Sequence, residues 1–346
     1  MALLNANALI SRLKIRVTPQ EIAAIDFSQA EIKCARLRRL NGNVQLVAAD
    51  VLPPVHGEAS AAKNAARRLI SLPAHLACRC VALCLPGNNA LVKLLSIPGH
   101  LDDSSEARIR ENMGISAGDY RIGYKVLGYS HGRVETKLLS IALPESEFQH
   151  YLGFFAIGWP VPVAAELAGV AGINTFMRGY LDNCADESAG VIQIEDKVSF
   201  FAFIHKKELV LVRKYEFGHD HILNAIQTRL NVNRETAWNV ASDQSFDISQ
   251  MLKEVGDSFI RQIVISKHFV ERRENCHVSR IFIPGSVPAA HLLAQDLRGA
   301  AETEVEQWNP LKAAVVPSEA AAHSLAGRAS QLGAAIGAGI GFFGEK

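Results

Sequence analysis

The feature that most constrains the fold is a strand, turn and strand pattern that occurs once in each half of the chain. The first copy runs from Ile22 to Lys33 and the second from Gly190 to Phe203. Each copy is followed by a tight polar turn, at Asn41-Gly42 and near Lys206-Lys207, and by further strand-forming residues. Apolar runs of β-branched and aromatic residues around such turns are typical of β-hairpins. The repeat predicts two related lobes that face each other across a cleft able to hold a nucleotide.

Composition narrows the class of protein. A length of 346 residues favours two domains or one large one, and 49% hydrophobic residues provide a core for each. A charged fraction of 21% and a net charge of +1 argue against disorder and against bulk nucleic-acid binding. The six cysteines lack the paired Cys-x-x-Cys spacing of a zinc site, so we expect no metal. We expect the cysteines to be buried free thiols, which fits a reducing compartment. Neither a secretory signal nor an apolar run of about 20 residues is visible, so we expect a cytoplasmic protein.

The order of periodic segments predicts four regions. Residues 1–18 carry a modest basic amphipathic pattern, and a membrane-interfacial helix, a flexible leader and a docked arm are the alternatives. Residues 19–87 and 161–186 form the first lobe, residues 88–160 an inserted α+β subdomain, and residues 187–346 the second lobe. Helical spacing predicts helices over residues 59–71, 103–113, 145–157, 220–230, 234–241, 248–270 and 288–297. It also predicts a helix that follows Glu166 and ends at Tyr180, and a closing helix from about residue 319 onward.

A set of short motifs shares its order and spacing with a known family. The motifs are Ile25-Asp26-x-Ser28-x-x-x-Ile32-Lys33, Val81 to Gly87, Ser96-Ile97-Pro98, Tyr124 to Gly128, Pro162 to Glu166, the hairpin at 190–213, Phe217-Gly218 and Ile281-x-Ile283-x-Gly285. Over residues 20 to 343 this order resembles the actin-like proteins of type IV pilus assembly, the PilM family, which are relatives of the cell-division protein FtsA.

The resemblance implies a two-lobed α/β fold of the actin/Hsp70-like (ribonuclease H-like) class with an inserted SHS2-type subdomain. It also implies that the chain is cytoplasmic, peripherally associated with the inner membrane, and binds the N-terminal tail of a PilN-like inner-membrane protein. Other pilus platform proteins and self-association are further expected contacts. The tail would lie in a groove lined by the strand at 91–97 and the helix at 145–157, with no individual residue assigned. An active actin-like ATPase and an FtsA-like or secretion-platform scaffold are the alternative functions.

The same resemblance identifies a first candidate nucleotide turn. In this fold, two hairpin turns bind phosphates through backbone N–H groups, and an aspartate in each organises magnesium and its waters. The first turn keeps Asp26, Ser28, Gln29 and Lys33, but Phe27 stands where glycine would let the backbone approach a phosphate. Lys33 could instead be an ordinary strand lysine, either solvated or packed along its stem.

The second turn departs further from the family pattern. Gln193 stands where the second aspartate is expected, and Glu195 stands where a glycine is expected. A carboxylate about 4 Å from a phosphate charge opposes binding by about 4 kcal/mol at an effective dielectric of about 20. Asp196 would contact magnesium only if the register shifted, and Ser199 completes the candidate set. We therefore expect no hydrolysis, while ATP and Mg²⁺ binding without hydrolysis stays open.

Other candidates have two interpretations each. Gly285 and Ser286 match a turn that lies against adenine in the family, or form an ordinary turn after a strand. Glu166 matches a recurrent family glutamate, or is a carboxylate favoured at a helix start. In the segment 219–221, His-Asp-His, we expect Asp220 to cap a helix rather than bind metal. We interpret Gly333, Gly337 and Gly341 as small residues that let the closing helix lie close to the sheet.

Overall fold

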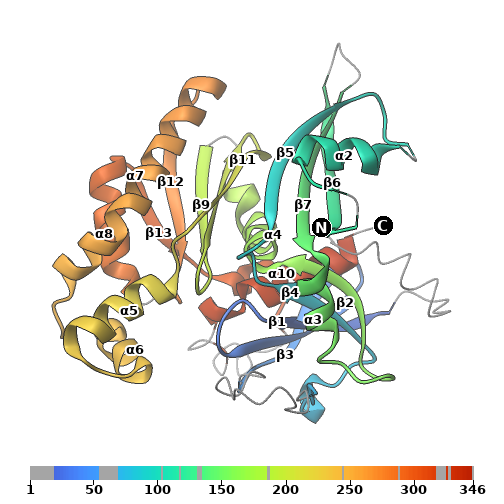
Figure 1. Ribbon diagram of the computed structural model, residues 1–346, viewed down its shortest axis with the longest axis horizontal. Coiled ribbons are helices and arrows are strands. Elements are labelled where there is room, and N and C mark those ends of the chain that lie inside the picture. The colour runs from blue at the N-terminus through green and yellow to red at the C-terminus, as the bar shows by residue number, and fades with distance from the viewer. Residues whose placement is uncertain are drawn as a thin grey trace. The chain divides into compact units, whose positions relative to one another are not determined.

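The computed structural model describes residues 19–53, 69–102, 104–116, 118–130, 135–184, 188–243, 245–286, 289–316, 325 and 329–344. The chain divides into two compact units, drawn in Figure 1. Unit 1 comprises Met1–Gly179 and Pro310–Lys346, and unit 2 comprises Tyr180–Asn309. The expected division differs from this one at two places: residues 180–186 belong to unit 2 and not to the first lobe, and residues 310–346 belong to unit 1 and not to the second lobe.

Unit 1 is built on a five-stranded sheet. Its strand order is β3 (Asn43–Leu52), β2 (Ile32–Leu40), β1 (Glu21–Asp26), β4 (Cys80–Leu85) and β8 (Val161–Leu167). β1, β2 and β3 are antiparallel neighbours, whereas β4 runs parallel to both β1 and β8. The first hairpin is therefore confirmed, with Asn41 and Gly42 at positive φ in the β2–β3 turn.

Two helices pack in unit 1 through a close backbone approach. α10 (Gly333–Gly344) contacts β1, β2 and β4, and α4 (Ala168–Tyr180) follows β8. A Cβ placed on Gly337 would come within 1.8 Å of the Ala171 carbonyl oxygen, so only glycine fits there. Thr175 in α4 also donates a hydrogen bond to the Gly333 carbonyl oxygen at 2.6 Å. These contacts explain why the closing helix belongs to unit 1: its apolar face is buried there.

The inserted subdomain has the predicted order of elements. These are β5 (Leu91–Pro98), α2 (Ser105–Met113), β6 (Tyr120–Ser130), β7 (Glu135–Pro144) and α3 (Glu145–Leu152). The sheet order is β5-β7-β6 with antiparallel pairing, and Ile97, Ile109 and Leu138 centre a small core shared with α2. The expected helix at 145–157 ends early, at Leu152, because Gly153 caps it and a loop follows.

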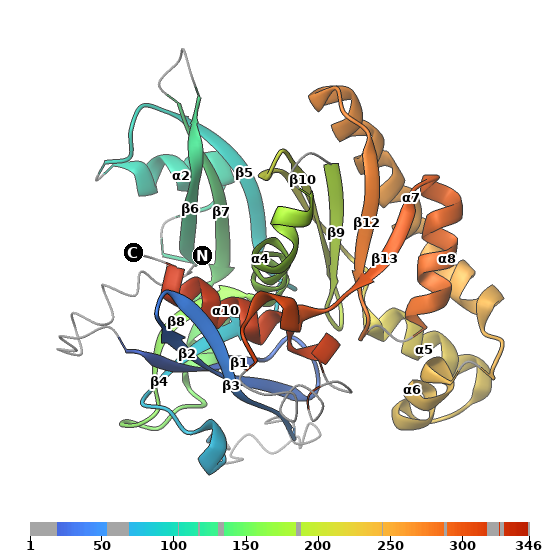
Figure 2. The ribbon, with the colours of Figure 1, turned by 180° about the vertical axis from the view of Figure 1, so that it is seen from behind.

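Unit 2 repeats the strand pattern of unit 1. Its sheet order is β11 (Glu208–Tyr215), β10 (Ser199–His205), β9 (Ser188–Ile194), β12 (Val278–Pro284) and β13 (Glu304–Trp308). Again three antiparallel strands are followed by two parallel ones. Its helices are α5 (His219–Leu230), α6 (Arg234–Ser242), α7 (Ser249–Glu274) and α8 (Ala290–Ala301), and Figure 2 shows α7 and α8 beside the β12–β13 side of the sheet. The repeated hairpin is thereby confirmed.

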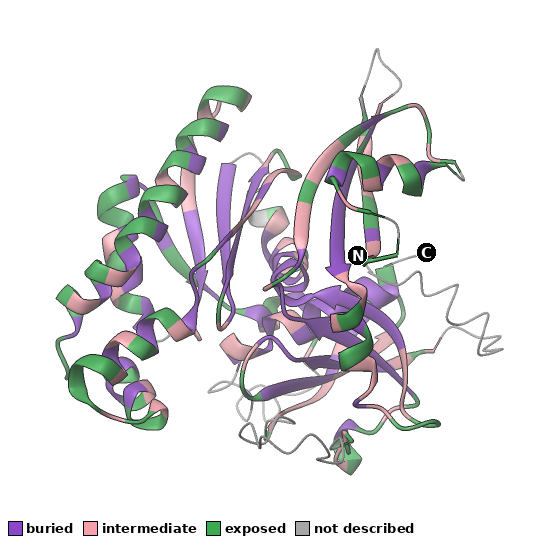
Figure 3. Cartoon of the chain, viewed as in Figure 1, coloured by how far each residue is buried: buried purple, intermediate pink, exposed green. Residues whose placement is uncertain are grey.

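The remaining described elements are short, and some of the predicted helices lie outside the described residues. The other described elements are η1 (Ala74–Leu76), η2 (Leu181–Cys184), η3 (Pro310–Ala313) and η4 (Ala329–Leu332). Residues 1–18, most of the expected helix at 59–71 and the expected helix start near 319 lie outside the described residues. The five-stranded sheets of unit 1 and unit 2 are each buried through most of their length (Figure 3). Among the described residues, no helix combines the length and the apolar character needed to cross a membrane.

Candidate functional site

The first candidate turn lies at the carboxyl end of β1, and its first N–H groups are bonded to the Asp26 side chain and to β4. Asp26 ends the strand with 2% of its surface exposed. Its carboxylate oxygen Oδ1 accepts a hydrogen bond from the Ser28 N–H at 2.8 Å, and the Phe27 N–H donates to the Cys84 carbonyl oxygen at 3.0 Å. The first two N–H groups after Asp26 are therefore already bonded within unit 1.

Phe27 does more than replace a glycine, because its ring is buried. Only 8% of Phe27 is exposed, and its ring centroid lies 5.2 Å from that of Tyr151 and 6.0 Å from that of Phe154. His150 and Tyr151 also contact Phe154 edge-on. The turn is thus joined by an aromatic cluster to α3 and to the loop after it, in the inserted subdomain.

Lys33 and Gln29 come together on the same turn. The Lys33 ammonium donates to the Gln29 side-chain oxygen and, at 3.1 Å, to the Glu31 carbonyl oxygen. Only 2% of Lys33 is exposed, so the interpretation of a solvated strand lysine is wrong, whereas a strand lysine with a packed stem agrees with this burial. The register of the hairpin pairs Lys33 with Asp26 across β1 and β2, which places a buried cation beside the buried carboxylate.

Glu166 lies in a different element from the one predicted. It belongs to β8, and α4 begins two positions later at Ala168, so the helix-start interpretation is wrong. The register pairs Asp26 with Cys84 and Cys84 with Glu166 across three parallel strands. Two buried acidic residues therefore share the carboxyl edge of the unit 1 sheet, about 10 Å apart at two strand spacings. Sequence spacing alone gave no signal for this alignment.

The second candidate turn is held by backbone contacts with the start of α5. The Glu195 N–H donates to the Val198 carbonyl oxygen at 2.9 Å, which closes the turn. The carbonyl oxygens of Glu195 and Asp196 accept hydrogen bonds from the N–H groups of His219 and Asp220, at 3.0 and 2.8 Å. The turn therefore uses its carbonyl groups to bind the helix end.

Gly218 makes this docking sterically possible. A Cβ at Gly218 would lie 2.4 Å from the carbonyl oxygens of both Glu195 and Asp196. Gly218 is also the N-cap of α5, and its N–H donates to His221 Nδ1 at 3.1 Å. The prediction that Asp220 caps this helix is wrong, because Asp220 lies in the first turn; the Phe217-Gly218 pair was the available signal.

Asp196 is surrounded by positively charged or basic groups. Its carboxylate lies 3.4 Å from His219 Nδ1 and 3.8 Å from the Arg234 guanidinium, which also contacts Asp220 at 2.7 Å. His219 is fully buried, and neither of its ring nitrogens nor the Gln193 Nε2 has a hydrogen-bond partner among the described residues. No metal-ligating group of three or more side chains occurs in the described part of the chain, the segment 219–221 included.

The other predicted residues of unit 2 lie at the same edge of the sheet. The Ser199 hydroxyl is buried and donates to the Phe217 carbonyl oxygen at 2.6 Å, so it fixes the strand to the segment before α5. Gly285 and Ser286 form a turn directly after β12, which runs parallel to β9, so they follow the same sheet edge as Gln193. Residues 287–288, the end of the predicted glycine turn, lie outside the described residues.

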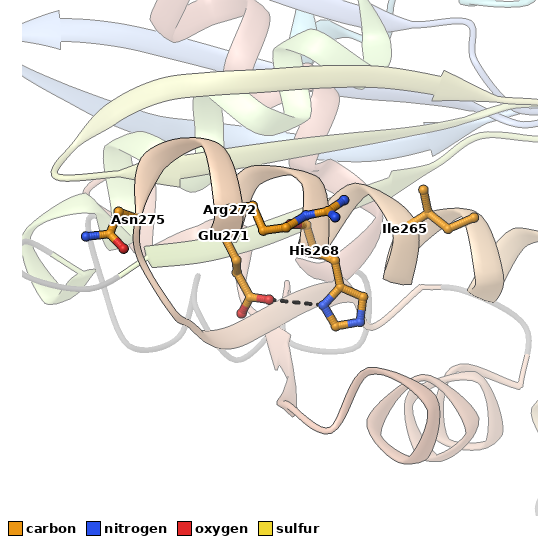
Figure 4. Close-up of a pocket in the computed structure, with 5 residues that line it drawn as sticks. All are labelled: Ile265, His268, Glu271, Arg272 and Asn275. Carbon is orange, nitrogen blue, oxygen red and sulfur yellow. Dashed lines mark hydrogen bonds and ion pairs between the residues drawn. The ribbon is translucent and has the colours of Figure 1, made fainter.

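A separate surface pocket lies along α7 in unit 2. Figure 4 shows its lining residues, Ile265, His268, Glu271, Arg272 and Asn275. Glu271 accepts hydrogen bonds from the Val278 N–H at 3.0 Å and pairs with Lys267 at 3.1 Å. Burial alone would raise its pKa, but these bonds outweigh that effect and hold the pKa below the ordinary value. The acidic group of this pocket is thus engaged in joining α7 to β12 and is not poised for catalysis.

Comparison with known proteins supports the fold. No family model and no curated protein matches the chain by sequence. A solved structure described as the PilM-PilN type IV pilus biogenesis complex matches with a TM-score of 0.75 and 15% identity, over 94% of this chain and 99% of the matched one. An actin-like ATPase-fold protein of unknown function from Bacteroides thetaiotaomicron (TM-score 0.44, 10% identity, 85% and 94% coverage) and the archaeal actin homolog Ta0583 (0.45, 11%, 94% and 100%) are more distant. This chain therefore has a PilM-like actin fold.

Proposed function

We propose that this chain is a cytoplasmic actin-like scaffold of a type IV pilus assembly platform, peripheral to the inner membrane. In this role it binds the N-terminal tail of a PilN-like membrane protein and does not hydrolyse ATP. The observation that carries the proposal is the match in fold to a subunit of a PilM-PilN complex over 94% of this chain. At 15% identity this match supports the fold alone, and the PilN-like partner is our inference from it.

The structure of both hairpin turns supports the absence of hydrolysis. A phosphate-binding turn needs backbone N–H groups that point at the ligand. Here the N–H groups of Phe27, Ser28 and Glu195 are all bonded to protein oxygens. Releasing such bonds costs free energy that a bound phosphate would have to offset, and the Glu195 carboxylate would add repulsion.

The edge strand β5 supports a peptide groove in the inserted subdomain. Within the described part of the chain, β5 pairs with β7 alone, so its other edge can accept an added strand. Lys93 faces α2, where its ammonium bonds the carbonyl oxygens of Asn112 and Met113. The alternate residues Val92 and Leu94 are half-buried on the opposite face and would supply side-chain contacts to the peptide.

Binding of the tail peptide tests the partner. We would titrate the full chain with a fluorescent peptide of the first cytoplasmic residues of the PilN-like protein from the same genome. Val92→Arg and Leu94→Arg should each weaken binding at least tenfold, whereas Lys125→Ala on the opposite edge strand β6 should not. An unaltered affinity in both β5 variants would reject the groove, and no binding by the unaltered chain would reject the partner.

Two measurements with Mg-ATP test the proposal that the chain does not hydrolyse ATP: an assay of phosphate release, and calorimetry of binding. We expect no phosphate release above the level of a heat-denatured sample. Magnesium-dependent hydrolysis that disappears in Asp26→Ala would overturn the scaffold assignment in favour of an actin-like ATPase. Heat of binding without phosphate release would indicate a nucleotide-binding scaffold.

A further inference from the structure

The loop between α3 and β8, residues 153–160, presents large apolar side chains to solvent. Ile157 is the most exposed of the large hydrophobic residues described, and Trp159 is 61% exposed. Gly158 lies between them with φ of +124°, a backbone conformation that glycine adopts easily. The exposed stretch can be followed after α3 in Figure 3. A solvent-exposed isoleucine and tryptophan directly before and after this glycine indicate a contact surface.

The chemical character of this loop is uniform. No charged residue occurs from Tyr151 to Ala165, a segment that includes two phenylalanines, Ile157 and Trp159. A protein-binding surface usually carries a polar rim of hydrogen-bonding groups around its apolar centre. The loop itself supplies no side-chain ion-pairing group for such a rim, which favours an apolar medium over a protein partner.

The base of the loop is fixed to the body of unit 1. Phe154 is buried in the aromatic cluster with Phe27 and Tyr151, and its carbonyl oxygen accepts a hydrogen bond from the Ile70 N–H at 2.9 Å. The tip is therefore carried on a rigid support. Rigid support lowers the conformational entropy lost when the tip enters another phase.

The positively charged side chain of Arg79 lies against the Trp159 ring. The Arg79 guanidinium carbon sits 4.9 Å from the centre of the Trp159 ring. Tryptophan is enriched at membrane interfaces because its ring is apolar and its N–H is polar. An arginine beside it can bind lipid phosphate with its guanidinium. Two exposed apolar side chains and a cation against one of them provide the groups that would contact the acyl chains and headgroups of a bilayer.

We propose that the 153–160 loop inserts Ile157 and Trp159 into the interfacial layer of a phospholipid bilayer, with Arg79 at the headgroup phosphates. Two side chains bury less apolar surface than a myristoyl chain, which binds membranes with a constant of only about 10⁴ M⁻¹. The loop thus orients a protein that another contact recruits, and does not anchor it alone. The inference requires no pilus partner, so its failure and that of the proposed function are separable.

Tryptophan fluorescence of the full chain with protein-free vesicles tests the insertion locally. Trp159 is the most exposed of three tryptophans, the others being the half-buried Trp238 and the buried Trp308. Vesicles of phosphatidylethanolamine and phosphatidylglycerol in equal parts should shift the emission to shorter wavelength, and bromine-labelled acyl chains should quench it. Trp159→Phe should abolish both signals, even if residues 1–18 also bind the vesicles.

Matched variants complete the test. Ile157→Ser should weaken vesicle binding at least threefold, whereas Ile265→Ser, at the exposed Ile265 of α7, should leave it unchanged. Arg79→Gln should reduce the preference for phosphatidylglycerol over phosphatidylcholine. An unshifted Trp159 signal with saturating vesicles would overturn the proposal. Self-association that Ile157→Ser abolishes, with no lipid signal, would also overturn it and assign the loop to a contact between copies.

Discussion

The two hairpin turns have the same place in their sheets but are closed in different ways. In unit 1, the turn after β1 is filled by the Phe27 side chain, which packs on Tyr151 and Phe154 of the inserted subdomain. In unit 2, the turn after β9 is held by main-chain hydrogen bonds from its carbonyl groups to the first N–H groups of α5. Both turns use hydrogen bonds of their own N–H groups; in addition, the first is stabilised by apolar burial and the second by backbone docking to a helix.

The difference shows two ways in which a turn at the end of a strand can be fixed to the rest of the protein. Buried backbone groups of such a turn need hydrogen-bond partners, and here the protein itself supplies them. The Phe27 side chain connects the first turn to the inserted subdomain. The backbone contacts near Gly218 connect the second turn to the neighbouring helix α5. We therefore expect substitutions in the first turn to affect the inserted subdomain and those in the second to affect unit 2 alone.

Within the two turns, the largest expected effect is at Gly218. In Gly218→Ala, the added Cβ would meet two carbonyl oxygens at 2.4 Å, and backbone atoms cannot rotate away as a side chain can. We expect a loss of at least about 3 kcal/mol in the free energy of unfolding, at the upper end for overpacking. Urea denaturation measures the loss. Gly299→Ala is the control, because nothing lies within 4 Å of its Cβ, and helical alanine should stabilise by up to about 1 kcal/mol. Equal stability of the two variants would disprove the docking.

Phe27→Ala should have the next largest effect, and a different spatial pattern. Removing a mostly buried phenylalanine typically costs 3–5 kcal/mol, but here the ring lies at a turn that can partly close, so we expect about 2 kcal/mol. Hydrogen exchange should increase in α3 and the 153–160 loop. Exchange in α5 should be unchanged. Faster exchange in α5 but not in α3 would contradict the comparison of the two turns.

Local sequence patterns were sufficient to predict the repeated sheets. Alternating apolar residues and the turns at Asn41-Gly42 and Lys206-Lys207 identified both hairpins, and the latter pair adopts the positive φ of a tight hairpin turn. The inserted subdomain followed from the same periodicity. These features depend on residues near one another in the chain, and their physical signals are therefore local.

The features that sequence missed depend on contacts between distant segments. Phe27 was recognised as a missing glycine, but its burial against Tyr151 and Phe154 requires the inserted subdomain to be folded in place. The glycine spacing predicted close packing of α10 on the sheet, but it did not show that Gly337 would lie against Ala171 of α4. The alignment of Glu166 with Asp26 likewise follows from strand register across Cys84.

The two turn serines offer a smaller and more exact comparison. Ser199→Ala removes the hydroxyl that donates to the Phe217 carbonyl oxygen at 2.6 Å, so the free energy of unfolding should fall by about 1 kcal/mol. Ser28→Ala should change it by less than about 0.5 kcal/mol, because the Ser28 bond to Asp26 uses the backbone N–H that alanine keeps. Thermal or urea unfolding measures both. The reverse ranking would show that the first turn also depends on its polar side chain.

Cys34 provides the mildest test, since its own side chain is probed without being substituted. Burial raises the pKa of its thiol to about 12, and the nearby charges of Asp26 and Asp50 act in the same direction. At pH 8 only about one thiol in 10⁴ would be the reactive thiolate. We expect native Cys34 to resist iodoacetamide while the partly exposed Cys276 reacts, with peptide mapping by mass spectrometry as the measurement. In Phe27→Ala, Cys34 should become more reactive if the aromatic cluster keeps the first turn closed. An unchanged rate in that variant would mean that the β1–β2 hairpin protects the thiol without the cluster, and that the first turn resembles the second after all.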